Sequence, residues 1–197
     1  MAVELRKGQK VNLEKKGPSL GEILINLNWS QPQKKRGFFA PKPQPIDLDL
    51  GCLFELQDGT RGCVQALGNA FGSLNTPPYV ALDGDDRTGT NAGGENLRVN
   101  GAMIPKIKRL LIYTFIYEGV ANWREADGVV TVKCPGSQDI IVRMDEYATS
   151  QRMCAIALME NADNETFSVE KVVRFFDSHM PMDRAFGWGL NWVAGRK

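Results

Sequence analysis

Apolar and polar residues alternate through most of the chain. This predicts β-strands, because successive side chains of a strand point to opposite faces. Residues 22–29 place Ile23, Ile25, Leu27 and Trp29 on one face. Residues 46–57 do the same with a longer apolar set: Ile46, Leu48, Leu50, Cys52, Phe54 and Leu56.

The run at residues 110–117 (LLIYTFIY) is apolar on both faces, as expected of a strand in the middle of a sheet. Further strands are expected at residues 129–133, 138–144 and 153–160. Asp58-Gly59 predicts a two-residue hairpin turn into a strand at residues 60–67. In that register Cys52 and Cys63 are diagonal neighbours on the apolar face, where small core residues are the favoured interpretation over a reactive thiol pair.

One helix is expected late in the chain. Val169, Val172, Val173 and Phe176 repeat at helical spacing until Pro181, and His179 would lie at the end of this helix. Many short strands with one late helix predict a mainly β protein, a two-sheet β-sandwich forming a single domain over residues 1–197.

Residues 30–45 (SQPQKKRGFFAPKPQP) have four prolines and no periodicity, which predicts a long, mobile, basic surface loop. Lys34, Lys35, Arg36 and Lys42 stand there beside Phe38 and Phe39, so the loop is also a candidate for contact with a polyanion or an anionic membrane surface.

Composition narrows the function classes. The chain has 197 residues, four separated cysteines without a C-x-x-C pair and a single histidine, His179, so zinc and iron–sulfur sites lack a ligand set. No window is long and apolar enough for a membrane span, and the first residues lack the apolar core of a secretory signal, so a cytoplasmic location is expected. No nucleophile with a partnered base is recognisable, and an enzyme is not expected.

Charge is distributed unevenly. Residues 1–43 carry nine Lys/Arg against three Asp/Glu, whereas residues 44–100 carry three against eight. Asp47 and Asp49 share one face of the strand at 46–57, about 7 Å apart, and repel each other unless a cation or donor lies between them. Two solvated acids at a strand end are the simpler alternative.

A second acidic segment follows at residues 82–96 (LDGDDRTGTNAGGEN). Carboxylates, hydroxyls and amides in a glycine-rich loop suit Ca²⁺, which takes six to eight oxygen ligands. The spacing does not fit an EF-hand.

These motifs resemble the TerD family of bacterial tellurium-resistance and stress proteins. The opening ELRKGQKVNLEKKGPSL, the strand-borne Asp47-Leu48-Asp49, the loop Gly84-Asp85-Asp86-Arg87-Thr88-Gly89 and the later IYTFIYEG are similar to family motifs in the same order. The basic loop and the ending DRAFGWGLNWVAGRK are similar to a divergent, TerA-like branch.

The resemblance implies a Ca²⁺-binding β-sandwich that acts in tellurite or stress resistance. It implies one or two ions held by oxygen donors at seven positions: Asp47, Asp49, Asp85, Asp86, Thr88, Glu95 and Asn96. Gly94 and Asn96 stand where the family usually has acidic residues, so weakened affinity is expected. The preference for Ca²⁺ over Mg²⁺ is left open.

The resemblance also implies partners among other stress-resistance proteins, in an assembly at or near the membrane. Nucleic acid is not expected as a partner, and self-association is left open. The rival hypotheses are a metal-free structural interaction protein, a polyanion or membrane-surface binder, and an enzyme acting on tellurium or thiol species through reactive cysteines.

Overall fold

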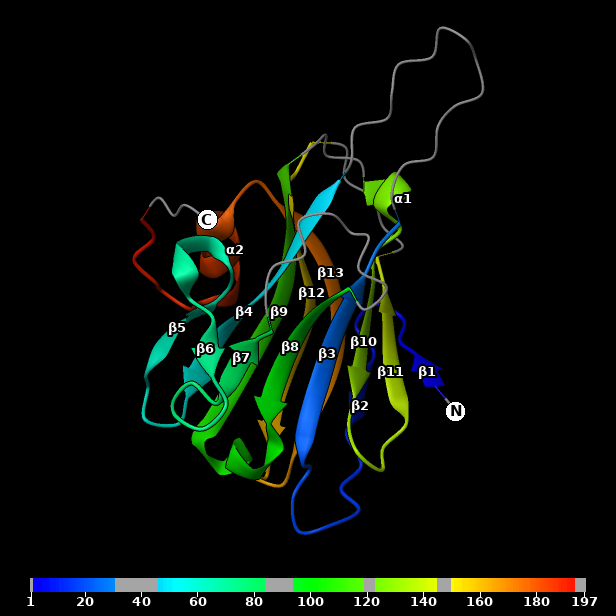
Figure 1. The fold of residues 1–197 in the computed structure, drawn as a ribbon, viewed down its shortest axis with the longest axis vertical. Helices are drawn as coiled ribbons and strands as arrows, with labels where there is room; N and C mark the ends of the chain where they lie inside the picture. Colours follow the sequence, from blue (N-terminus) through cyan, green and yellow to red (C-terminus); the bar gives the residue numbers. More distant parts are fainter. Residues whose placement is uncertain (1, 31–45, 84–93, 119–122, 145–149, 194–197) are drawn as a thin grey trace, which may run out of the picture.

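The computed structural model describes residues 2–30, 46–83, 94–118, 123–144 and 150–193. Within these residues two β-sheets pack face to face (Figure 1). The first sheet, called sheet A, has seven strands in the order β1 (Ala2–Glu4), β11 (Asp139–Arg143), β10 (Val129–Lys133), β3 (Glu22–Asn28), β8 (Glu95–Asn100), β7 (Val80–Leu82) and β6 (Gly72–Ser73).

The second sheet, called sheet B, has six strands. Their order is β2 (Lys10–Asn12), β13 (Thr166–Phe176), β12 (Met153–Ala162), β9 (Ile107–Glu118), β4 (Asp47–Leu56) and β5 (Arg61–Val64). Neighbouring strands are antiparallel, except that β1 pairs with β11 in parallel.

The main core lies between the two sheets, where the inward residues of alternating strands meet. Ile23, Ile25 and Leu27 of β3 face the apolar residues of β4 across this space. The expected strands at 22–29, 46–57, 110–117, 129–133, 138–144 and 153–160 are all present, and the two-sheet sandwich is confirmed.

A smaller core covers the outer face of sheet B. There Leu53, Leu111 and Tyr113 pack against Met182 and Trp188 of the C-terminal segment, which includes helix α2 (His179–Phe186). This explains why residues 110–117 are apolar on both faces.

The helix expected at residues 169–176 is wrong, because these residues form the second half of strand β13. Phe167, Val169 and Val173 lie in period-two alternation and are buried in the main core, and the pairing with β12 shifts register around Ile156. The late helix begins only at His179, after Ser178. Pro181 lies in its first turn, where a missing backbone N–H removes no helical hydrogen bond.

The two-residue turn at Asp58-Gly59 is also wrong. Glu55 pairs with Arg61, and the loop closes with a hydrogen bond from Leu56 N to Thr60 O (2.8 Å), which leaves three residues in the turn. Gly59 has φ +88°, the left-handed conformation that a three-residue hairpin requires at its last position.

Cys52 therefore pairs with Val64, and Cys63 pairs with Leu53. A shift of one residue moves a side chain to the opposite face. Cys52 faces the main core, whereas Cys63 packs on the outer cluster.

The remaining described elements are short: η1 (Leu67–Asn69), η2 (Gly101–Lys106) and α1 (Trp123–Ala126). No helix in the described ranges is both long and apolar enough to span a membrane. The predicted mobile loop falls almost entirely at residues 31–45, outside the described residues.

Candidate metal centre

Asp47 and Asp49 open strand β4, and both are buried, with 6% and 0% of their surface exposed. Asp49 lies opposite Phe115 of β9, on the outer face of sheet B. On the other side of β4, pairing with β5 begins only at Cys52, so among the described strands the first residues of β4 have no neighbour on that side. The alternative of two solvated acids is therefore contradicted.

Glu95 reaches the start of β4 from the other sheet. It is the first residue of β8, it is 3% exposed, and its Oε2 accepts a hydrogen bond from Leu50 N at 2.6 Å. The side chain thus connects the start of β8 in sheet A to the first half of β4 in sheet B. Three candidate carboxylates are buried around the starts of these two strands.

Asn96 faces away from Glu95. Its Oδ1 accepts a hydrogen bond from Asn26 Nδ2 at 2.8 Å, across the β3–β8 pair on the outer face of sheet A. Gly94, just before β8, has φ +63°, and a Cβ there would lie 2.1 Å from the carbonyl oxygen of Leu27. A side chain at position 94 would need a different backbone, which explains the glycine.

Asp83, at the other end of the acidic loop, has a structural partner. Arg98 Nε lies 2.6 Å and 2.7 Å from its two carboxylate oxygens, and Arg98 also binds Glu22. The pKa of Arg98 is raised, mainly by the hydrogen bonds to Asp83 and Glu22. Asp83 therefore anchors β7 to β8 at the point where the loop leaves the sheet.

The other predicted donors, Asp85, Asp86 and Thr88, lie outside the described residues. Among the residues that the structure describes, no group of three or more His, Cys, Asp or Glu side chains is arranged to hold a metal ion. Asp47, Asp49 and Glu95 would need further donors from residues 84–93 to complete a coordination shell.

A buried polar group adjoins Asp49 on the outer face of sheet B. Tyr113 Oη donates to Gln65 Oε1 at 2.7 Å, and His179 Nε2 lies 2.9 Å from the same oxygen. Burial raises the pKa of Tyr113 well above its usual value, and the nearby Asp49 adds to the shift. Tyr113 crosses β4 over Gly51, where a Cβ would lie 2.5 Å from the ring.

The expected place of His179 at the end of a helix is wrong, because it is the first residue of α2. Its ring lies 4.7 Å from that of Trp192 and 5.3 Å from that of Phe115. Burial lowers its pKa from 6.5 to about 4, so the ring is neutral at pH 7.

The thiols do not form a reactive pair. Cys52, Cys134 and Cys154 are buried, and Cys63 is partly exposed. Burial raises the pKa of Cys52, Cys63 and Cys134, which disfavours the nucleophilic thiolate.

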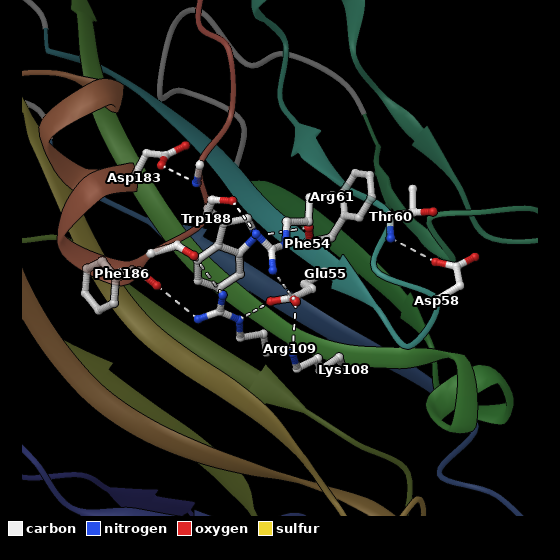
Figure 2. A network of polar contacts seen from close by, with 12 residues as sticks. Phe54, Glu55, Asp58, Thr60, Arg61, Lys108, Arg109, Asp183, Phe186 and Trp188 are labelled. Carbon is white, nitrogen blue, oxygen red and sulfur yellow. Dashed lines mark hydrogen bonds and ion pairs between the residues drawn. The ribbon is translucent and has the colours of Figure 1, made fainter.

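Sequence reasoning missed a charged cluster around Glu55, shown in Figure 2. The Glu55 side chain is 1% exposed and accepts bonds from Arg61 (2.9 Å), Lys108 (2.9 Å) and Arg109 (2.5 Å). Burial by itself raises the pKa of Glu55, but the three basic partners outweigh it and lower the pKa to about 2. The sequence held one sign of this cluster: the basic residues Lys108 and Arg109 stand together at the start of a long apolar strand, where an acidic partner is expected.

This cluster fastens the C-terminal segment to the sandwich. Arg109 lies 3.8 Å from the ring centre of Trp188 and donates to the carbonyl oxygens of Phe186 and Gly187 (Figure 2). Arg61 donates to Trp188 O at 2.9 Å, and Trp188 Nε1 donates to Phe54 O at 3.0 Å.

Comparison with known proteins agrees with this architecture. The sequence profile of the TerD domain matches residues 1–173. The chain is 43% identical to tellurium resistance protein TerA from an Alcaligenes species, over 95% of this chain and 58% of that protein. It is 32% identical to general stress protein 16U of Bacillus subtilis, over 84% of this chain and 80% of that protein.

A solved structure has the same fold. It is described as a homologue of a telluride resistance protein (TerD) from Streptomyces coelicolor, with a TM-score of 0.57 and 18% identity over 83% of this chain and 95% of that chain.

The fold and these matches define a β-sandwich of the tellurium-resistance and stress-response class. The chain belongs to the TerD family, as its motifs predict. It spans 58% of the length of the TerA protein it matches, and α2 lies beyond the residues matched by the family profile.

Proposed function

We propose that this chain is a non-catalytic Ca²⁺-binding module of a bacterial tellurium-resistance or stress-response system. The observation that supports the proposal best is the burial of Asp47, Asp49 and Glu95 around the starts of β4 and β8. Burying several like charges is costly, and a divalent cation is one effective compensation. Hard oxygen donors favour Ca²⁺ or Mg²⁺ over transition metals.

In this proposal the ion links the two sheets. Asp47 and Asp49 would supply donors from sheet B and Glu95 from sheet A, while Asp85, Asp86 and Thr88 would complete the shell. Metal binding and folding would then be coupled, since the unfolded chain cannot bring these donors together.

The affinity is expected to be modest. Gly94 supplies no carboxylate, and the amide oxygen of Asn96 is engaged by Asn26 on the other face of sheet A. Affinity for Ca²⁺ follows the number of charged ligands and the rigidity of the site.

The proposal that the chain is not an enzyme is supported by the surroundings of its histidine and of its described thiols. His179 is packed among aromatic rings, and the described thiols are buried or have raised pKa values. Neither provides an accessible nucleophile beside a base.

A metal-free structural role is the second candidate. It is favoured by the hydrogen bond from Leu50 N to Glu95, which joins β4 and β8 directly. In that case the acidic residues would stabilise the fold alone, and added cations would leave stability unchanged.

Thermal unfolding measured at increasing Ca²⁺ concentration distinguishes the Ca²⁺-binding role from the metal-free role. At a free Ca²⁺ concentration about a hundred times the dissociation constant, stabilisation is about 2.7 kcal/mol, or roughly 5 to 10 °C in melting temperature for a chain of this size. Asp49→Asn combined with Asp85→Asn should remove this increment. Asp163→Asn, on an exposed turn, is the matched control and should keep it.

A melting curve that does not move at millimolar Ca²⁺ would sink the calcium proposal and favour the metal-free role. Parallel titration with Mg²⁺ reports the ion preference.

A further inference from the structure

A hollow of about 300 Å³ lies beside strands β12 and β13, on the outer face of sheet B. None of its lining residues belongs to the candidate metal centre. Its walls come from the turn before β2, from these two strands and from α2, and include Lys7, Leu158, Glu170, Val172, Arg174 and Phe186.

The turn that carries Lys7 is fixed to β13. Gly8 N donates to Lys171 O at 2.9 Å, and Lys171 N donates to Gln9 O at 3.2 Å. Arg6 and Gln9 close the turn with hydrogen bonds between them. Lys7 is therefore held at one wall of the hollow by its backbone.

Arg174 stands on another wall, and its guanidinium lies 5.0 Å from the ring centre of Phe176. Phe176 packs edge-on against Phe186 of α2, with ring centres 6.1 Å apart. The cation is thus positioned by aromatic packing at the edge of the pocket.

The lining is positive overall. Lys7 and Arg174 give two positive charges against the one negative charge of Glu170. Lys171 contributes its backbone, because its side chain is buried on the inner face with Val169 and Val173. Glu170 is paired with Lys10 at 2.9 Å. A small anion entering the hollow would therefore meet a favourable potential.

The rest of the wall is apolar. Leu158, Val172 and Phe186 are partly buried and pack on the outer core cluster. A fully hydrated inorganic ion would leave this surface without a partner, whereas an apolar group would cover it.

We propose that this hollow binds a small organic anion in which a phosphate or carboxylate adjoins an apolar group. Lys7 and Arg174 contact the anionic head, while Leu158, Val172 and Phe186 contact the apolar part. The same chemistry occurs in a soluble aryl or alkyl phosphate and in an anionic lipid headgroup.

Phenyl phosphate is a suitable probe, titrated into the full chain at low salt without Ca²⁺ and followed by NMR of the backbone amides. Saturable shifts are expected at Gly8 and Val172. Lys7→Gln and Arg174→Gln should each weaken binding roughly tenfold, as expected for loss of one charge-assisted contact. Lys133→Gln, an exposed lysine at the end of β10, is the control and should leave the affinity unchanged.

The proposal is overturned if phenyl phosphate does not saturate at millimolar concentration, or if Lys133→Gln weakens binding as much as Arg174→Gln. If inorganic phosphate binds as tightly as phenyl phosphate, the proposed contact between the apolar wall and the ligand is overturned. Co-sedimentation with vesicles of phosphatidylcholine and phosphatidic acid distinguishes the sources: binding that Lys7→Gln and Arg174→Gln reduce identifies a lipid headgroup. Binding of phenyl phosphate without vesicle binding identifies a soluble ligand.

Discussion

His179 illustrates how far the surroundings of a residue can change its chemistry. In the sequence it is an isolated titratable group near a proline, and a charged histidine at a helix end is the simple expectation. In the fold its ring is enclosed by Phe115, Tyr113 and Trp192 and contacts Gln65. Desolvation then favours the neutral ring.

We predict that stability depends on pH through His179. Its pKa is about 4 when folded and about 6.5 when unfolded, so the unfolded chain takes up the proton first. Stability is therefore highest above pH 6.5 and is lost as the pH falls towards 4, by on the order of 3 kcal/mol. Denaturant unfolding at several pH values should show this slope in the wild type, and His179→Gln should flatten it. Parallel curves for the two proteins would show that His179 is not responsible.

At the level of elements, the hairpin between β4 and β5 determines which side chains enter the core. A three-residue turn ending at Gly59 places Cys52 inside and Cys63 outside, whereas a two-residue turn would place them on the same face. The sequence Asp58-Gly59 is compatible with both the two-residue and the three-residue turn, because glycine tolerates positive φ in either one.

We predict that Gly59→Ala destabilises the protein by about 1 kcal/mol, because alanine is strained at φ +88°. Gly17→Ala is the matched control. Gly17 has no positive φ, and a Cβ there would meet only Ser19 O at 3.9 Å. Chemical denaturation of both variants checks this; an equal effect of the two substitutions would indicate a different turn.

Strand β13 shows why local periodicity misled. Val169, Val172, Val173 and Phe176 fit a helix, but Phe167, Val169, Lys171 and Val173 are buried at every second position, which is the pattern of a strand. Pairing with β12, through the hairpin at residues 162–166, and with β2, which is far away in sequence, satisfies its backbone.

At the level of the whole molecule, the C-terminal segment acts as a cover over sheet B. The main core is formed without any residue beyond β13, whereas the outer cluster needs Met182 and Trp188. Asp183 holds the segment closed by accepting hydrogen bonds from Gly189 N (2.7 Å), Leu190 N (2.9 Å) and Trp192 Nε1 (3.0 Å).

We predict that Asp183→Asn loosens this segment while the sandwich stays folded. Replacing a buried carboxylate that accepts three hydrogen bonds costs about 1 to 3 kcal/mol. Local opening should rise roughly tenfold or more, which limited proteolysis near residues 187–193 measures.

Asp177→Asn, at an exposed position just before α2, is the control and should be cleaved at the wild-type rate. If Asp183→Asn is cleaved at the same rate as the wild type, the apolar contacts alone hold the segment.

The sequence by itself determined β3, β4, β9, β10, β11 and β12, the two-sheet class and the family, because period-two alternation and short motifs are local properties of the chain, but it took β13 for a helix. It also selected Asp47, Asp49 and Glu95. Only the tertiary structure decided that these carboxylates are buried, that Glu95 bonds to Leu50, that Asn96 faces the other side and that Glu55 gathers three basic residues. Burial, register and charge pairing depend on which distant strands meet, and that is set by the packing of the whole sandwich.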